Sequence, residues 1–339
     1  MKHSIFAAAV LTLLQACQES TSPRQVVQSS LSEAVGVEAS VGQHLWAVVN
    51  RNGYLVRGSR VARVVHVGLG QYEVTFTRNV TQCAYLATTI KSSREAYVIT
   101  AAGGHQSVNG VYLEIKTQMY NPTDGPFNLV VACRELGNRF AVVGYSHNLV
   151  RATPGTTVDY QNSGGYHVTF TSSVRACAYI ATVADPENGS VPLPGGLVAT
   201  ARSSGDNSIF VQTFSVAGGE QEGVPFHLAL ICSPTQASRY AVLRGDGILH
   251  RSSPGTTSAL ISSGRYTVTT DRDLTQCAAV ATRGSIGGRF PAPPATVEII
   301  PGLTANSGDF LVRRLLLDVP RGYSGGAYSN QEFHAAVFC

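Results

Sequence analysis

The chain has 339 residues, of which 44% are hydrophobic and 14% charged, and its formal net charge at pH 7 is +4. This apolar content excludes a chain that is disordered along its whole length. The small net charge, without a clustered basic face, gives no basis for a nucleic-acid partner. The 34 glycines and many Val, Thr and Tyr residues predict short strands joined by turns.

Residues 1–16 have the pattern of a secretory signal peptide. Lys2 supplies a basic start, residues 4–14 form a largely apolar run, and Ala16 is a small residue before the predicted cleavage point. The run is shorter than the roughly 20 apolar residues that a membrane-spanning helix needs. We therefore expect these residues to be removed on export.

The tetrapeptide Leu14-Gln15-Ala16-Cys17 resembles the lipobox of bacterial lipoproteins. The resemblance implies cleavage before Cys17 and a diacylglycerol on its thiol, so that the membrane becomes a partner through durable acyl anchoring. Gln18, in place of an Asp, is similar to the pattern of lipoproteins sent to the outer membrane. This implies a lipid-anchored location in the bacterial cell envelope, at the outer membrane or the cell surface. The alternative is an ordinary signal peptide that contains a cysteine.

Residues 17–43 form a predicted lipidated tether. The segment 18–23 is polar and contains Ser and Pro, as flexible linkers do. The apolar residues of segment 26–35 have spacings near three and four, so one short helix is the alternative. In either form the segment would hold the rest of the chain away from the membrane.

A stretch with the pattern Tyr-x-Val-Thr, followed by Cys-Ala-x-x-Ala-Thr, occurs three times. Its copies lie at 72–88, 166–182 and 266–282. An aromatic residue opens each copy, 37 residues before its first cysteine, and these residues are Trp46, Phe140 and Tyr240. Such agreement indicates duplication of a small domain. We predict three β repeats in tandem, at 44–135, 136–235 and 236–339, arranged like beads on a string.

Within one copy the pattern predicts about eight antiparallel strands. Asn52-Gly53 and Asp246-Gly247 are typical of tight hairpin turns, which need positive φ. Apolar residues alternate over 72–76, so we expect Glu73 and Thr75 to face water. Short strands at about ten-residue spacing predict an all-β fold, a β-sandwich or squat barrel in each copy. In the first copy we place the strands at Trp46–Val49, Tyr54–Arg57, Arg63–Val67, Gln71–Phe76, Cys83–Thr89, Ala96–Ala101, Val111–Thr117 and Phe127–Cys133.

Apart from Cys17, the cysteines fall two in each copy. Export permits disulfides, and pairing inside each copy is the only scheme that duplication preserves at every step. Each bridge would close a loop of 50 or more residues, which stabilises the fold by about 4 kcal/mol. Metal binding is the alternative, but it lacks a C-x-x-C pair or a nearby His partner. The predicted disulfides are Cys83–Cys133, Cys177–Cys232 and Cys277–Cys339.

Two sets of equivalent residues are candidates for recognition. One is the set of arginines Arg57, Arg151 and Arg251. Their guanidinium groups could clamp a carboxylate or sulfate, and the alternative is a salt bridge or a solvated strand end. The other set is the opening aromatics, which could stack on sugar rings. Their varying size favours core packing instead.

The remaining polar residues give weaker indications. His227 and His334 occupy one equivalent slot, where the first copy has Asn128, and this tolerance predicts a hydrogen-bonding edge or surface group. The sequence around Ser324 matches the G-x-S-x-G elbow of serine hydrolases, but in an all-β context a simple loop is favoured. Phosphate-loop, dinucleotide, zinc-protease and EF-hand motifs are absent, so we expect no cofactor and no metal.

The copies also resemble a repeated β-domain of secreted bacterial proteins that carries no assigned function. The resemblance covers residues 46–339 and rests on four shared patterns: an opening aromatic-Ala-Val-[Val/Leu], Tyr-x-Val-Thr, Cys-Ala-x-x-Ala-Thr and a closing Phe-x5-Cys. It implies a fold type and export, and it implies no reaction.

The leading functional hypothesis is a non-enzymatic, lipid-anchored envelope protein. Its three β-domains would act as a spacer or an adhesin-like display array, because the repeats share no polar constellation suited to catalysis. The alternative is a binding module for a glycan or protein, with specificity in the variable loops 90–110, 184–208 and 283–309. A serine hydrolase that uses Ser324 is a distant alternative.

Overall fold

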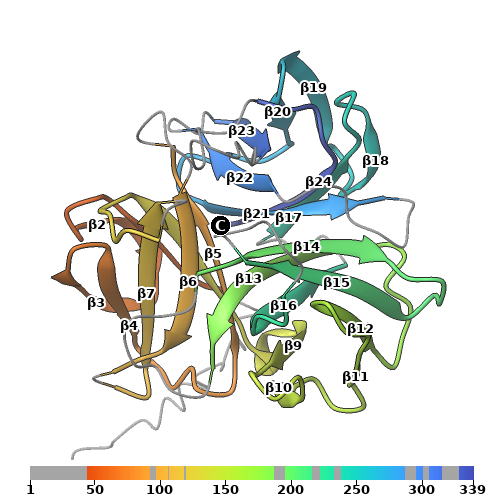
Figure 1. The fold of residues 1–339 in the computed structure, drawn as a ribbon. Coiled ribbons are helices and arrows are strands. Elements are labelled where there is room, and N and C mark those ends of the chain that lie inside the picture. Colours follow the sequence, from red (N-terminus) through yellow and green to blue (C-terminus); the bar gives the residue numbers. More distant parts are fainter. Residues whose placement is uncertain are drawn as a thin grey trace, which may run out of the picture. The chain divides into compact units, whose positions relative to one another are not determined.

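Alternating apolar residues and positive-φ turns fold each of the three copies into eight strands (Figure 1). The computed structural model describes residues 44–339 except 92–96, 106, 118–119, 187–194, 216–221, 233–237, 287–294, 301–304 and 315–327. The described residues contain no α-helix and one short 3₁₀ turn at Arg134–Leu136. The prediction of an all-β fold is confirmed.

The strands have the same order in every copy. The first copy holds β1 (Leu45–Val49), β2 (Leu55–Ser59), β3 (Val61–Gly68), β4 (Gln71–Phe76), β5 (Ala84–Thr89), β6 (Tyr97–Gly103), β7 (Gly110–Thr117) and β8 (Phe127–Ala132). The second holds β9 (Arg139–Val143), β10 (Leu149–Ala152), β11 (Thr157–Tyr160), β12 (Gly165–Thr169), β13 (Ala178–Asp185), β14 (Leu197–Arg202), β15 (Ser208–Phe214) and β16 (Phe226–Ile231). The third holds β17 (Ser238–Leu243), β18 (Leu249–Ser252), β19 (Thr257–Ser262), β20 (Arg265–Thr269), β21 (Ala278–Ser285), β22 (Ala295–Ile299), β23 (Ser307–Arg314) and β24 (Phe333–Phe338).

Each copy is a sandwich of two four-stranded antiparallel sheets. The inner sheets have the orders β2-β1-β8-β5, β10-β9-β16-β13 and β18-β17-β24-β21. The outer sheets have the orders β3-β4-β7-β6, β11-β12-β15-β14 and β19-β20-β23-β22. A separate apolar core fills the space between the two sheets of each copy. The predicted β-sandwich architecture is therefore present three times.

The turn residues adopt the positive φ angles that the sequence predicts. Gly53 has a φ of +79° and Gly247 a φ of +85°, as expected for the first hairpin of the first and third copies. The second copy places His147 at this turn with a φ of +60°. A side chain on Gly53 would meet the Cβ atom of His66 at 2.6 Å, so both its conformation and its surroundings favour glycine.

One disulfide closes each sandwich, with the predicted partners. Cys83 is bonded to Cys133, Cys177 to Cys232 and Cys277 to Cys339. In the first copy the bridge joins the start of β5 to the end of β8, which are neighbours in the inner sheet. The chain therefore needs no distortion to bring each pair together.

A fourth apolar core lies between the three copies, so the copies are not independent domains arranged like beads on a string. Each copy contributes six buried side chains to it from the outward face of its inner sheet. Trp46, Phe140 and Tyr240 belong to this shared core and are 4%, 2% and 6% exposed, as the core-packing alternative predicted. Residues 40–339 accordingly form one compact unit.

Strands also pair between copies. β6 lies parallel to β13 over three residue pairs, and β14 lies parallel to β21 over three. Between the first and third copies the corresponding pairing is a single parallel bridge from Ile90 to Ile299. β5, β13 and β21 come together where the three copies adjoin (Figure 1).

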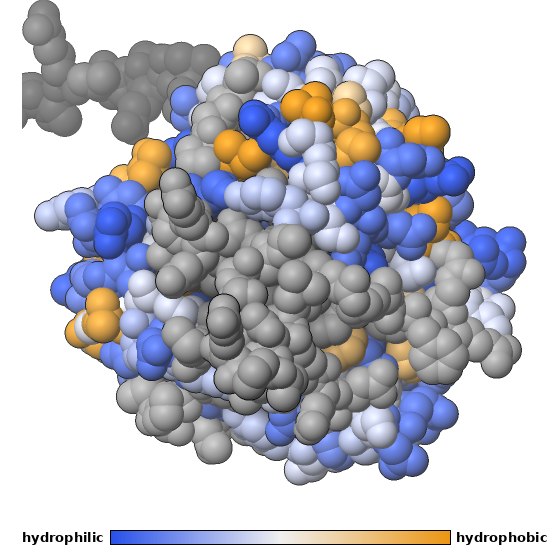
Figure 2. Space-filling model, turned by 45° about the horizontal axis from the view of Figure 1, so that its top comes forward, coloured by the Kyte–Doolittle hydropathy of each residue, from blue (hydrophilic) through white to orange (hydrophobic). Residues whose placement is uncertain are grey.

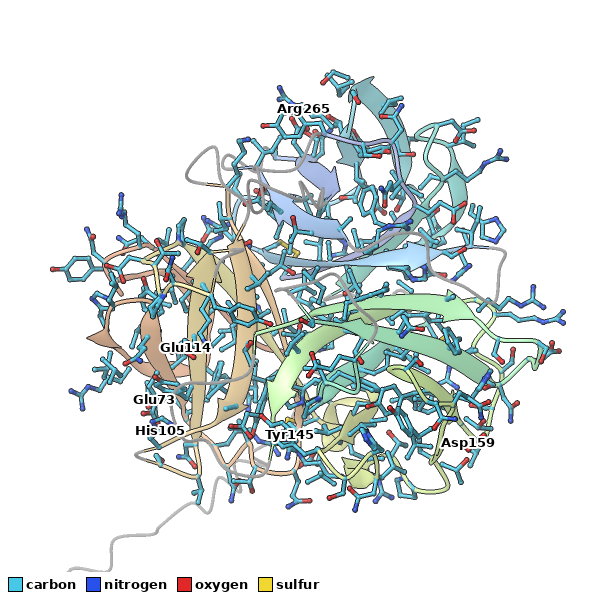
Figure 3. All side chains as sticks on the ribbon, in the orientation of Figure 1. Glu73, His105, Glu114, Tyr145, Asp159 and Arg265 are labelled. Atoms are coloured by element: carbon cyan, nitrogen blue, oxygen red, sulfur yellow. A yellow bond between two sulfur atoms is a disulfide. The ribbon has the colours of Figure 1, made fainter. Side chains whose placement is uncertain are left out.

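The exposure predicted for Glu73 is wrong. Its side chain is 1% exposed, Thr75 is half-buried, and the apolar residues of β4 are buried as expected. Glu73 lies opposite Tyr112 in the register of β4 and β7, and the ring of His105 stacks on Tyr112 at 3.9 Å. Side chains therefore cover this outer face as well, and Figure 3 labels Glu73, His105 and Glu114 there.

Several predictions fall outside the described residues. They are the signal peptide, the lipidation at Cys17, the tether and the loop that contains Ser324. The part of the chain that the structure describes has no helix long and apolar enough to cross a membrane.

Candidate functional site at the junction of the first and third copies

A row of four residues crosses the inner sheet of each copy and faces the neighbouring copy. In the second copy it is Arg151, Val142, His227 and Thr182, which are direct partners across β10, β9, β16 and β13. The same register gives Arg251, Val242, His334 and Thr282 in the third copy. In the first copy it gives Arg57, Val48, Asn128 and Thr88. We call this set the junction row.

Hydrogen bonds from the junction rows close the three copies into a ring. The Nε atom of Arg151 donates to the carbonyl oxygen of Cys83 at 2.7 Å, which joins the second copy to the first. Arg251 donates in the same way to Cys177 at 2.6 Å, and Arg57 donates to Cys277 at 2.8 Å. Each row therefore contacts the preceding copy, and the first row contacts the third copy.

These contacts change the interpretation of the shared arginines. All three were candidates for recognition, with an ion pair or a solvated strand end as the alternative. Each instead uses its Nε atom to hold a backbone carbonyl of another copy. Because Arg151 and Arg251 are also packed against aromatic rings, only Arg57 retains the surroundings of a recognition residue.

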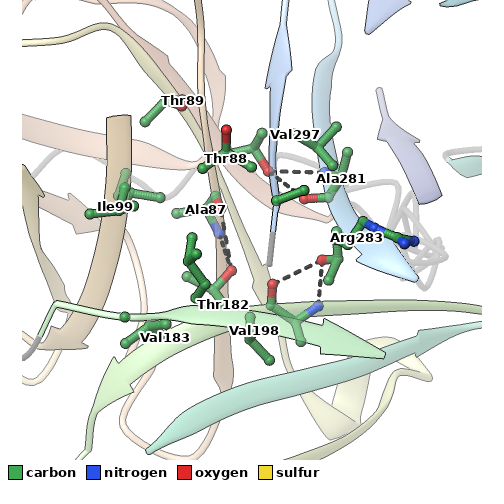
Figure 4. A pocket seen from close by; sticks show the side chains of 17 residues that line it. Ala87, Thr88, Thr89, Ile99, Thr182, Val183, Val198, Ala281, Arg283 and Val297 are labelled. Carbon is green, nitrogen blue, oxygen red and sulfur yellow. Dashed lines mark hydrogen bonds between the residues drawn. The ribbon is translucent and has the colours of Figure 1, made fainter. Parts of the chain in front are cut away.

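The threonines of the junction rows form a second ring around the centre. Thr182 accepts a hydrogen bond from the amide of Ala87 at 2.9 Å, Thr282 from Ala181 at 2.7 Å, and Thr88 from Ala281 at 2.9 Å (Figure 4). Each hydroxyl also donates to the carbonyl of the same alanine. They border a central cavity of about 60 Å³. Because these hydroxyls are fully paired and the space suits water molecules, the cavity is not a strong ligand site.

Two of the three junctions are filled by a cluster of Arg, Tyr and His side chains in contact with one another. Between the first and second copies, the guanidinium of Arg151 lies 5.2 Å from the ring centre of Tyr85, and His227 packs on the same ring at 4.8 Å. Between the second and third copies, Arg251 lies 4.9 Å from Tyr179 and His334 packs on it at 4.8 Å. These contacts combine cation–π attraction with aromatic packing.

The two histidines are core residues. Both are 0% exposed, so the prediction of an edge or surface group is wrong. Nδ1 of His334 accepts a hydrogen bond from the amide of Tyr179 at 2.8 Å, which fixes its ring across the junction. Burial, and then the positive charge of Arg151 or Arg251, lowers the pKa of His227 and His334 well below its ordinary value. Both imidazoles are therefore neutral.

The third junction lacks both the Tyr ring and the His ring. Ala279 occupies the position of Tyr85 and Tyr179, and Asn128 occupies the position of the histidines. Arg57 keeps its hydrogen bond to Cys277, but no described aromatic ring lies against its guanidinium. β5 is also two residues shorter than β13 and β21, so the parallel pairing of this junction ends after one bridge.

A pocket of about 290 Å³ occupies this third junction. Its walls are mainly aliphatic and include Val48, Val56, Ile90, Pro126, Ile299 and Ile300. Three polar residues line it, namely Asn50, Arg57 and Asn128. The volume is just below the range for ligand pockets, roughly 300 to 1,000 Å³.

The polar groups of the pocket differ in how they are engaged. Oδ1 of Asn50 accepts hydrogen bonds from the amides of Asn52 and Tyr54, so it belongs to the turn. Asn128 is 1% exposed, and its Oδ1 is buried without a hydrogen-bond partner. Among the described residues, Arg57 has no carboxylate partner, and burial alone lowers its pKa. The pocket therefore presents one cation and one amide oxygen without a hydrogen-bond partner.

Other candidate sites are weaker. The described residues contain no group of three or more His, Cys, Asp or Glu side chains that could hold a metal ion. The face in Figure 2 carries hydrophobic residues in small separate groups among hydrophilic ones, where described residues are visible. Of the variable loops 90–110, 184–208 and 283–309, the described parts include β6, β14 and β22, which pair with strands of neighbouring copies or border the junctions.

Sequence reasoning singled out Arg57 but missed Asn128 as a site residue. The signal was present in the alignment of the copies, where Asn replaces His and Ala replaces Tyr. Comparison with known proteins adds no further assignment, because the chain matches no protein family model, no curated protein and no solved structure.

Proposed function

We propose that this chain is an exported, lipid-anchored binding protein of a bacterial cell envelope, without enzymatic activity. Its binding site is the pocket between the first and third copies. The observation that carries this proposal is an aliphatic pocket of about 290 Å³ at the one junction that lacks the Tyr and His rings. Three disulfides agree with an oxidising compartment outside the cytoplasm.

The closed ring favours a binding protein over a spacer. In a spacer, successive copies would extend the chain away from the membrane. Here each copy contacts the other two through the shared core and the junction rows. This arrangement adds rigidity around one site rather than length. A display function through the variable loops for a glycan or protein remains the second candidate, supported by the differing lengths of those loops.

Binding is tested with 1-octanol, a neutral apolar probe. Full-length protein that carries Cys17→Ser avoids lipidation and detergent. We expect 1-octanol to raise its melting temperature in a saturable way, because a ligand that binds only the folded state stabilises it. Asn128→His, which supplies the side chain of the two filled junctions, should abolish the rise. An equal rise in both proteins, or none in the parent, would contradict the proposal.

The anchor is tested by the intact mass of the mature protein from membranes. Cleavage before Cys17 with added acyl chains is the expected result. A mature chain that begins beyond Cys17 and carries no acyl mass would make it a soluble secreted protein. The distant hydrolase alternative is tested with a fluorophosphonate probe, whose labelling should not depend on Ser324.

A further inference from the structure

The positions of Arg57 and Asn128 define the two ends of a site. Both are register partners of Val48, so they flank it across β2, β1 and β8 on the same face of the inner sheet. Two strand spacings separate their Cα atoms, about 10 Å. The floor between them is the aliphatic side chain of Val48. A ligand that uses both polar groups must therefore have an apolar body between two polar ends.

Arg57 is held in place before any ligand arrives. Its Nε atom is fixed on the carbonyl oxygen of Cys277 at 2.8 Å, which leaves the terminal guanidinium nitrogens to other partners. At the filled junctions, Nη2 of Arg151 and of Arg251 is buried without a hydrogen-bond partner, whereas Arg57 lines an open pocket. A guanidinium fixed in this way is suited to carboxylate recognition, because two parallel N–H groups match two carboxylate oxygens.

From this arrangement we propose that the pocket binds a monocarboxylate with an apolar body, such as a medium-chain fatty acid or an arylalkanoic acid. This inference rests on the proposed binding function and specifies the class of ligand. A single guanidinium balances one negative charge, and the aliphatic walls disfavour a multiply charged ligand. The buried Oδ1 atom of Asn128 adds a preference for a hydrogen-bond donor at the far end of the ligand.

The volume agrees with a ligand of this size. The pocket encloses about 290 Å³, close to twice the roughly 150 Å³ of an apolar cavity that accepts benzene. Val56 is 56% exposed at one side of the pocket, while Asn128 and Ile299 are 1% and 2% exposed. The site is therefore open at the β2 side and closed toward β8 and β22.

Three probes of equal chain length test the charge. Octanoate, 1-octanol and octylamine are titrated into full-length protein with Cys17→Ser, and dissociation constants are measured by calorimetry. We expect octanoate to bind about tenfold or more tightly than 1-octanol, because the hydrogen bond is charge-assisted. Octylamine should bind most weakly, because its charge has the same sign as that of Arg57.

Substitutions of the arginines test whether Arg57 causes the preference for octanoate over 1-octanol. Arg57→Met should reduce the affinity for octanoate to that for 1-octanol, and Arg57→Lys should restore part of it. Arg251→Met is the matched control, since it removes the equivalent hydrogen bond at a filled junction, and octanoate binding should persist. If Arg57→Met does not fold, the Arg57→Lys variant and the three probes still test whether Arg57 binds the carboxylate.

The outcomes separate this inference from the proposed function. Equal affinity for octanoate and 1-octanol, unchanged by Arg57→Met, would overturn the carboxylate assignment and leave the binding function intact. Loss of binding in Arg251→Met but not in Arg57→Met would place the site elsewhere and overturn both. An 8-hydroxyoctanoate that binds more tightly than octanoate, with the gain lost in Asn128→Leu, supports the role of Asn128. A gain that survives Asn128→Leu contradicts it.

Discussion

The filled and open junctions use the same scaffold for different purposes. At each one a junction row contributes Arg, Val and Thr. The arginine donates a hydrogen bond to a cysteine carbonyl, and the threonine hydroxyl accepts one from an alanine amide. The filled junctions add Tyr and His rings, whereas the open junction has Ala279 and Asn128. A ring of three copies thus tolerates the loss of packing at one junction, because the backbone contacts there are retained.

The core of the third copy has larger side chains than the other two cores at two equivalent positions. Register with the equivalent strand places Phe310 opposite Tyr266, where the first copy has Leu113 and the second has Val211. Leu274 likewise occupies the slot of a valine in the other two copies. The core that contains Ala279 therefore holds larger side chains at these two positions. The space outside the sandwich, at the junction, is left open.

The largest effect is expected from opening a filled junction. Tyr179→Ala removes a ring that Arg251 and His334 pack against, and it should lower the free energy of unfolding by about 3 to 5 kcal/mol, as for other large aromatic truncations. Tyr179→Phe keeps the ring and loses the hydrogen bond to Val174, which should cost about 1 kcal/mol. Chemical denaturation measures both. Equal costs would show that the ring is not what fills the junction.

A smaller effect is expected from acid. His227 and His334 are neutral in the fold because burial lowers the pKa of each, and they titrate near 6.5 when unfolded. Below pH 6.5 the unfolded chain binds more protons, so their contribution is complete above pH 6.5. It falls as the pH decreases from 6.5 toward the lowered folded pKa. Within this range the loss should grow by at most about 1.4 kcal/mol per pH unit for each histidine.

Replacement of these histidines by Asn, the residue of the open junction, checks the assignment. The free energy of unfolding of His227→Asn should depend less steeply on pH between 5 and 7 than that of the parent. The same slope in both proteins would mean that His227 does not cause the acid sensitivity.

The smallest effect is expected from filling the open junction. Asn128→His supplies the ring of the other two junctions and removes a buried carbonyl without a partner. It should raise the free energy of unfolding by about 1 kcal/mol, as cavity filling commonly does. The reverse substitution at a filled junction, His334→Asn, should lower the free energy of unfolding. Destabilisation by Asn128→His would mean that the open junction has no space for the ring.

The sequence predicted what depends on local pattern. The eight strands, the hairpin at Gly53 and the cysteine pairing follow from alternation, turn chemistry and the register of the copies. The junctions could not be predicted in this way, because periodicity shows which face of a strand is apolar but not which copy covers it. Thus Arg57 appeared to be a surface or ion-paired residue, and His227 an edge group. In a string of independent domains both residues would lie at the surface, but in the closed ring they lie at junctions between copies.

A crystal structure of the protein under xenon pressure tests the central claim, that one junction is open and two are filled. Xenon enters dry apolar cavities. We predict a xenon atom beside Val48 and Ile299, and none at the equivalent positions beside Val142 and Val242. Equal occupancy at all three junctions, or none at the first, would contradict the account.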